Sequence, residues 1–172
     1  MRAGTRRWFL FAHVVCSMGW IGVELSMLTL GLVGLLDSNP VVVRSCYVVA
    51  GIFGGLFYFP AAALTLVTGV VLGLGTKWGL VRYRWVALKL VINVALLAGG
   101  SLLVIPRFVA ASEAATRNEP IGDTAIMLVS AMAAGLTLLL VATQVSIFKP
   151  WPKTRSHPQT NHLIILVTKI IS

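Results

Sequence analysis

The stretch that decides the fold runs from Trp8 to Leu36 and reads WFLFAHVVCSMGWIGVELSMLTLGLVGLL. Its only carboxylate is Glu24, and no Lys or Arg interrupts it. A helix needs about 20 mostly apolar residues to cross a bilayer, so this segment is long enough. Three further segments meet the same criterion: Cys46–Leu74, Trp85–Ile105 and Thr124–Phe148. The sequence therefore predicts an all-α polytopic membrane protein with a bundle of four transmembrane helices.

Basic residues gather beside one set of span ends. Nine of them lie before the first span, between the second and third, and after the fourth: Arg2, Arg6, Arg7, Lys77, Arg82, Arg84, Lys149, Lys153 and Arg155. The two opposite connections hold only Arg44, Arg107 and Arg117, beside Asp37, Glu113, Glu119 and Asp123. Because loops rich in Lys and Arg stay inside, the pattern predicts a multi-pass protein of the plasma membrane with both termini in the cytoplasm.

The composition excludes other broad classes. Of 172 residues, 58% are hydrophobic and only 11% are charged, which is too apolar for a soluble domain of this size. The net charge of +9 lies at span ends and forms no separate basic domain, so we predict no nucleic-acid partner. The lipid bilayer is the expected partner, and a homo-oligomer is left open. Cys16 and Cys46 lie at different depths, so we expect no disulfide between them.

The chain divides into residues 1–152, the transmembrane domain, and a cytoplasmic tail of residues 153–172. The tail is predicted to be disordered or interfacial, because its apolar run of nine residues is too short to span. Asp37–Pro40 predicts a turn after the first span. Pro60 predicts a kink in the second span, and the third is expected to end near Pro106. Glycines at 51, 54 and 55 offer a candidate oligomer interface on the second span.

Polar residues recur along one face of each span at helical spacing. On the first span, at 100° per residue, this stripe comprises His13, Ser17, Trp20, Glu24, Met27 and Gly31. The face predicted on the second span comprises Tyr58, Ala62, Thr65 and Gly69. The third span has Lys89, Asn93, Gly100 and Arg107 on one face. The fourth span has Ser130, Thr137 and Gln144. Since polar groups are costly in lipid, we expect these faces to point inward. His13, Lys89 and Gln144 should form a layer near the cytoplasm, with Glu24 further out beside Arg107, Tyr58 or Ser130.

Each ionisable residue in this set has a structural and a functional interpretation. Glu24 is either the paired carboxylate of a buried ion pair or a site that binds a proton or cation. Lys89 either extends to the inner headgroups, which we favour, or takes an interior role. His13 is a hydrogen-bonded packing residue or a metal ligand, the first being commoner. The aromatic residues Trp78, Tyr83 and Trp85 are typical of an interfacial belt.

The first span contains H-x6-W-x-G, formed by His13, Trp20 and Gly22. This resembles the first span of copper-resistance protein D-type membrane domains and of the membrane protoporphyrinogen oxidase. More closely, residues 5–152 resemble a family of small actinobacterial four-helix integral membrane proteins of unknown function, through the stretch Gly73–Lys89 and the ending Lys149-Pro150-Trp151. The closer resemblance implies the fold but no activity. The distant one implies that His13 is a haem or copper ligand, although no other span supplies a second His.

Three functions remain open from the sequence. The first, and favoured, is a non-enzymatic accessory or transport-like membrane protein, since no nucleophile–base set is present. The second is a haem- or copper-handling redox protein that uses His13. The third is a proton-coupled transporter built as an oligomer around Glu24, because four helices alone make a bundle too narrow for a pore. The candidate functional residues are His13, Trp20, Glu24, Lys89, Asn93 and Arg107.

Overall fold

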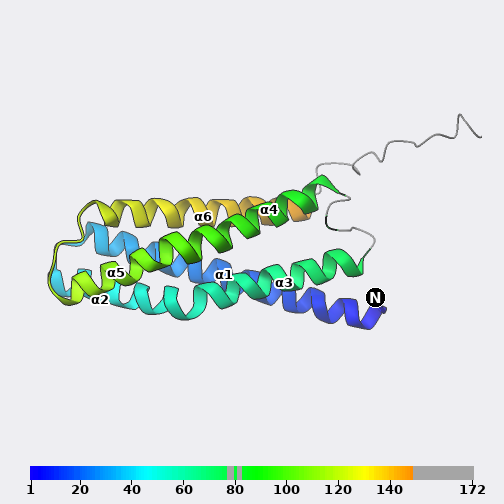
Figure 1. Cartoon of the computed structure of the whole chain (residues 1–172), viewed down its shortest axis with the longest axis horizontal. Coiled ribbons are helices and arrows are strands. Elements are labelled where there is room, and N and C mark those ends of the chain that lie inside the picture. Colours follow the sequence, from blue (N-terminus) through cyan, green and yellow to red (C-terminus); the bar gives the residue numbers. More distant parts are fainter. Residues whose placement is uncertain (77–79, 81–82, 149–172) are drawn as a thin grey trace, which may run out of the picture.

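The computed structural model describes residues 1–76, 80 and 83–148, and in that part every regular element is helical. The predicted tail and the aromatic residue Trp78 lie outside the described residues. The helices form an elongated bundle of four long stretches that run side by side (Figure 1). The first stretch is α1 (Ala3–Leu36), and the last is α6 (Asp123–Phe148). The all-α fold class is thus confirmed.

Each of the two middle stretches is a continuous helical run with a short π-helical segment inside it. The second stretch consists of α2 (Pro40–Phe53), η1 (Gly54–Tyr58) and α3 (Phe59–Gly75). The third consists of α4 (Arg84–Gly99), η2 (Gly100–Val104) and α5 (Ile105–Thr116). All four stretches are long and apolar enough to cross a membrane. Many of their large apolar side chains face outward, which is compatible with a lipid-covered surface.

The turn predicted at Asp37–Pro40 is confirmed. The Asp37 Oδ1 atom accepts a hydrogen bond of 2.7 Å from the Asn39 N–H, and the Asn39 side chain accepts one of 3.0 Å from the Val41 N–H. Asn39 is therefore the N-cap of α2, and Pro40 takes the first helical position, where its missing N–H costs nothing. The second span consequently starts six residues earlier than Cys46, the start we predicted.

We predicted that the third span ends near Pro106, with the Ala-rich residues after it able to extend the helix. The helix continues through this proline to Thr116, and Pro106 lies in the first turn of α5, directly after η2. Pro60 has the same place in α3, directly after η1. A proline has no N–H, so it removes one of the regular i→i−4 hydrogen bonds of a helix. In both stretches, the helix changes to π-type i→i−5 hydrogen bonds in the turn before the proline. The helix can therefore continue past both prolines.

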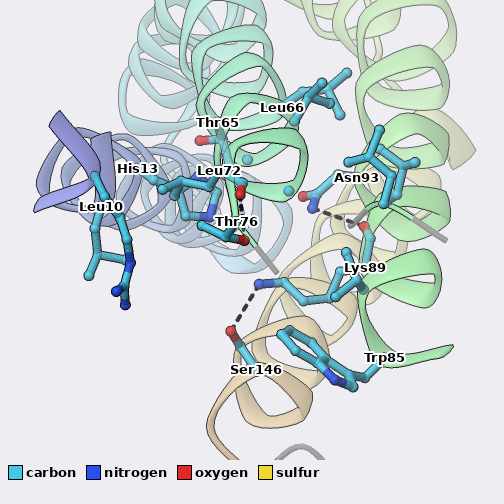
Figure 2. A pocket seen from close by; sticks show the side chains of 17 residues that line it. Leu10, His13, Thr65, Leu66, Leu72, Thr76, Trp85, Lys89, Asn93 and Ser146 are labelled. Carbon is cyan, nitrogen blue, oxygen red and sulfur yellow. Dashed lines mark hydrogen bonds between the residues drawn. The ribbon is translucent and has the colours of Figure 1, made fainter. Parts of the chain in front are cut away.

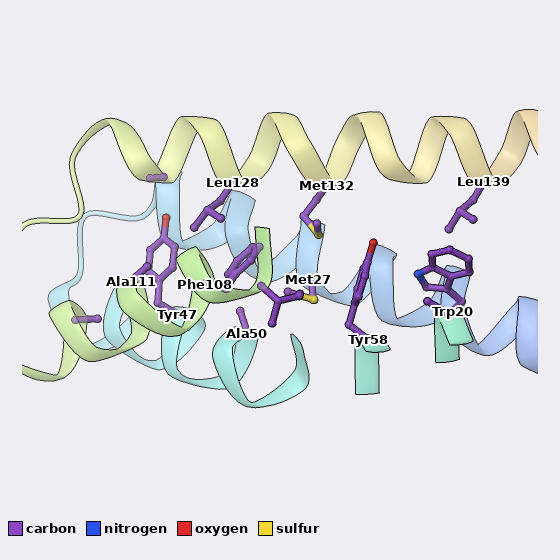
Figure 3. Packing of buried hydrophobic residues seen from close by; sticks show 14 residues of the cluster. Trp20, Met27, Tyr47, Ala50, Tyr58, Phe108, Ala111, Leu128, Met132 and Leu139 are labelled. Carbon is purple, nitrogen blue, oxygen red and sulfur yellow. The ribbon is translucent and has the colours of Figure 1, made fainter. Parts of the chain in front are cut away.

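Buried residues from all four stretches form one core. Trp20 of α1 meets Tyr58 of η1 and Met27 of α1 lies against Gly54 of η1, while Phe108 of α5 packs between α1, α2 and α6 (Figure 3). The Trp20 and Tyr58 rings lie edge to face, with their centroids 6.0 Å apart and their planes at 90°. This geometry is favourable for aromatic pairs. The core therefore fixes α1 against the π-helical segment of the second stretch.

Two of the three glycines that we proposed as an oligomer interface serve packing within the chain. A methyl group at Gly51 would touch the Ser112 side chain of α5 at 2.9 Å, and one at Gly54 would touch Met27 of α1 at 2.9 Å. Only Gly55 has open space beside it. The small residues of this face let α2 and η1 approach their own neighbours closely, so the proposed interface loses its structural basis.

Candidate functional site

A cavity of about 360 Å³ lies at the end of the bundle where α1 begins, α3 ends, α4 begins and α6 ends. We call this the N-terminal end of the bundle. The cavity reaches from Arg6 on α1 and Thr76 after α3 down to Thr65 and Asn93, within the long helices. Figure 2 shows His13, Thr65, Lys89, Asn93 and Ser146 around it, contributed by four different helices. Its volume lies in the range of small-molecule sites.

Lys89 lies inside this cavity. Its side chain extends from α4 toward the opposite helices, and Nζ donates a hydrogen bond of 3.0 Å to the Ser146 hydroxyl of α6 (Figure 2). Asn93, one turn further along α4, donates from Nδ2 to the Lys89 carbonyl at 2.9 Å. The ammonium group therefore lies at the depth of Ser146, close to the end of α6, and both the headgroup and the interior interpretations of Lys89 stay predictions. Ser146, and not Gln144, is the α6 residue in this layer, since Gln144 is exposed.

His13 lines the same cavity from α1. Its Nδ1 atom lies 2.9 Å from the Thr68 hydroxyl of α3. The Thr68 hydroxyl also lies 2.7 Å from the Leu64 carbonyl of its own helix, to which it can donate. Gly69 makes room for the imidazole, because a methyl group there would lie 3.1 Å from His13 Cε1.

A second, smaller cavity of about 40 Å³ continues from the first toward the middle of the bundle. It shares His13, Thr65, Lys89 and Asn93 with the larger one, and adds Ser17 and Trp20 of α1. Trp20 is fully buried and lies at the inner limit of this path. The polar groups thus form a continuous lining from the N-terminal end of the bundle to the Trp20 indole.

Glu24 lies on α1 one turn beyond Trp20, and only 1% of its surface is exposed. Within the described part of the chain, neither carboxylate oxygen has a hydrogen-bond partner. Its Oε1 atom faces Gly135 of α6 so closely that a methyl group at Gly135 would overlap it. The nearby Tyr58 hydroxyl is engaged elsewhere, since it donates to the Leu96 carbonyl at 3.1 Å. Glu24 is therefore a buried carboxyl group without a counterion among the described residues.

Arg107, which we expected beside Glu24, is elsewhere. Its side chain is exposed and donates from Nη1 to the Leu103 carbonyl of its own helical run at 2.6 Å. Among the described residues, the salt bridge joins Arg117 to Glu119, and both side chains are more than half exposed. The paired-carboxylate interpretation of Glu24 therefore finds no partner in the described chain.

The polar face predicted on the fourth span is wrong. Ser130, Thr137 and Gln144 are all exposed, whereas the buried face of α6 comprises Ala125, Leu128, Met132, Gly135, Leu139 and Ala142. Two of the exposed hydroxyls donate to carbonyls one turn earlier, Ser130 to Ile126 and Thr137 to Ala133. A hydroxyl that bonds its own helix needs no polar partner inside the bundle, so it can face lipid. On α1 and the second stretch, the predicted faces are buried or line the cavity.

Three residues that line the cavity were not predicted as site residues from the sequence. Trp85 is buried in the cavity wall, although we assigned it to an interfacial belt. Trp85 precedes Lys89 by four residues and Asn93 by eight, which places all three side chains on one face of the helix. This spacing could have predicted the position of Trp85 in the cavity wall. Arg6 and Ser146 also line the cavity. Arg6 was counted only as a topology signal, and nothing in the local sequence of Ser146 marks it as a partner of Lys89.

The residues present do not assemble a metal site by themselves. In the described ranges, no three or more His, Cys, Asp or Glu side chains gather closely enough to hold an ion. His13 is the residue that the resemblance would assign to haem or copper, and no second histidine lies in the described chain. Cys16 and Cys46 are both free. A Met or a second protomer would have to supply the other ligand, so the redox alternative that uses His13 stays a prediction.

Comparisons of the chain with protein-family models, with curated proteins and with solved structures find no match. The resemblances drawn from the His13 motif and from Gly73–Lys89 therefore stay predictions. What can be said about function rests on the geometry of the cavity and of Glu24.

Proposed function

We propose that this chain is a non-enzymatic, transport-like membrane protein of the plasma membrane, in which Glu24 binds and releases a proton. The observation that carries the proposal is the isolation of Glu24. A charge at the centre of a span costs about 2.5–3.5 kcal/mol on insertion scales, and a buried carboxylate without a partner has no local compensation. Such a group is costly to keep for packing alone, which favours a functional role.

The polar lining supports a route to this carboxyl group. His13, Ser17, Thr65 and Asn93 offer donors and acceptors from the N-terminal end of the bundle to Trp20. Water in such a polar path could pass protons along hydrogen bonds, while Trp20 separates the path from Glu24. The arrangement is that of a half-channel closed at its inner end by one aromatic side chain.

The orientation of the bundle follows from charge. The nine basic residues that flank the spans in the sequence, before the first, between the second and third and after the fourth, favour a cytoplasmic position for the N-terminal end of the bundle and for both termini. The cavity would then open to the cytoplasm, and Glu24 would lie in the outer half of the membrane. An oligomer remains part of the proposal, through a face other than that of Gly51 and Gly54.

Proton flux tests this function. We expect proteoliposomes that carry the wild-type chain to acidify their lumen faster than empty liposomes, under an inside-negative potassium diffusion potential with a trapped pH-sensitive dye. Glu24→Gln removes the titrating group and keeps its shape, so the rate should fall to that of empty liposomes.

Glu113→Gln is the matched control, because Glu113 is an exposed carboxylate of the same chain. This variant should keep the wild-type rate. Equal rates for the wild type and Glu24→Gln would remove Glu24 from the proposal.

A further inference from the structure

The larger cavity is cationic. Its described lining residues include Arg6 near its mouth and Lys89 at its centre, with His13 beside them, and none of the 17 is an Asp or Glu. Within the described chain, Nζ of Lys89 contacts a neutral hydroxyl, that of Ser146, and forms no salt bridge. A cation held in a partly buried position inside a span is usually paired with an anion. The side chains described around Lys89 do not provide one.

Beside the neutral polar residues Thr65, Thr76, Asn93 and Ser146, most of the remaining wall is apolar. Leu66 and Val70 of α3 and Val86 and Leu90 of α4 all line it. α3 and α4 are less closely associated than most neighbouring pairs of helices, and Trp85 is the one buried residue of α4. Figure 2 shows Leu66 of α3 and Asn93 of α4 above the Lys89 ammonium group, and Trp85 below it. A ligand in this space therefore meets one cationic end and two apolar walls.

From this charge and shape, we propose that the cavity binds an anionic amphiphile. The acidic headgroup, a carboxylate or a phosphate, would contact Lys89, with Arg6 near the entrance. The apolar chain would lie between α3 and α4. The proposal deepens the proposed function by naming the ligand class of its cavity, but it does not depend on proton movement through Glu24.

Binding can be measured without transport. We would place the purified chain in phosphatidylcholine nanodiscs and titrate it with a medium-chain fatty carboxylate that carries a terminal bromine. Bromine quenches tryptophan fluorescence on contact, and Trp85 lines the cavity. We expect saturable quenching in the wild type, and at least a tenfold loss of affinity in Lys89→Met, since a charge-assisted contact of about 1.4 kcal/mol corresponds to tenfold.

Two further variants distinguish the loss of the Lys89 charge from a change in the folded structure. Lys89→Arg retains the cation and should keep affinity within a few fold of the wild type. Arg107→Gln removes an exposed cation that bonds only its own helical run, and it should bind as the wild type does. Wild-type affinity in Lys89→Met, or equal losses in Lys89→Met and Lys89→Arg, would overturn the proposal.

Competition identifies the chemical class. Decanoate and decyl phosphate should both displace the brominated probe, whereas uncharged decanol should not. Inorganic phosphate alone should displace it far more weakly than decyl phosphate, because it cannot use the walls of α3 and α4. If decanol displaced the probe as well as decanoate does, the acidic group would have no role in binding. If inorganic phosphate displaced it as well as decyl phosphate does, the apolar chain would have no role, and the proposed amphiphile would be excluded. Either result would leave the Glu24 flux experiment standing on its own.

Discussion

Gly100→Ala should lower the free energy of unfolding by about 3 kcal/mol, at the upper end of what overpacking costs. Gly100 begins η2, and its Cα faces the Tyr58 ring of η1 so closely that a methyl group would overlap the phenol oxygen and ring carbons. Tyr58 cannot turn away cheaply. It is 1% exposed, its hydroxyl is bonded to the Leu96 carbonyl, and its ring meets Trp20 edge to face. Unfolding in detergent, followed by circular dichroism, measures the loss.

Gly99→Ala is the matched control for this substitution. It adds the same methyl group one residue earlier on the same helical run, where nothing lies within 4 Å. Because alanine favours helix over glycine by about 1 kcal/mol, this variant should be as stable as the wild type or slightly more so. A similar loss in both variants would show that the Tyr58–Gly100 contact is not the cause.

Glu24→Met should raise the free energy of unfolding by about 1–3 kcal/mol. A buried polar group without a hydrogen bond costs roughly this amount, and methionine fills a similar space with apolar atoms. The expectation rests on the carboxylate oxygens having no partner in the described chain. The measurement is again unfolding in detergent, and the variant should be inactive in the flux assay although it is more stable.

Glu24→Gln gives the comparison for this variant. Its amide is as poorly partnered as the carboxyl group that it replaces, so its stability should change less than that of Glu24→Met. If Glu24 held a hidden cation, breaking that pair would cost about 3–5 kcal/mol, and both variants would be strongly destabilised. That outcome would restore the structural interpretation of Glu24.

The inward face of α1 was predictable because α1 is a regular helix throughout. Counting 100° per residue from His13 correctly places Trp20, Glu24, Met27 and Gly31 on the buried side. The third span shows where such counting fails. A π turn takes up about one residue more than an α turn, so η2 changes the register between Gly100 and the residues after it. Lys89 and Asn93, before η2, face the cavity, whereas Arg107, after it, faces outward.

Polarity alone also failed as a guide to the interior of α6. Ser130 and Thr137 satisfy their hydroxyls on their own helix, so their polarity carried no information about the bundle. The residue that matters on α6 is Gly135, which carries no polar group and makes room for Glu24. Likewise, the Lys89–Ser146 contact joins residues 57 positions apart, and no local pattern predicts which hydroxyl a lysine reaches.

The cavity contains polar groups, opens at the N-terminal end of the bundle and leads in between the long helices. Cysteine accessibility tests this arrangement with two adjacent residues of α3. Thr65 lines both cavities, whereas Leu64 is exposed on the outer surface, where lipid would cover it. Cys16 and Cys46 would first be replaced by serine or alanine, so that Thr65→Cys and Leu64→Cys each carry a single thiol.

The measurement is the rate of labelling by a membrane-impermeant thiol reagent, applied in turn to inside-out and right-side-out vesicles. We predict that Thr65→Cys reacts from the cytoplasmic side only, because water reaches it through the cavity, and that Leu64→Cys is unreactive from both sides. Reaction of Thr65→Cys from the outer side, or a rate no higher than that of Leu64→Cys, would contradict the account.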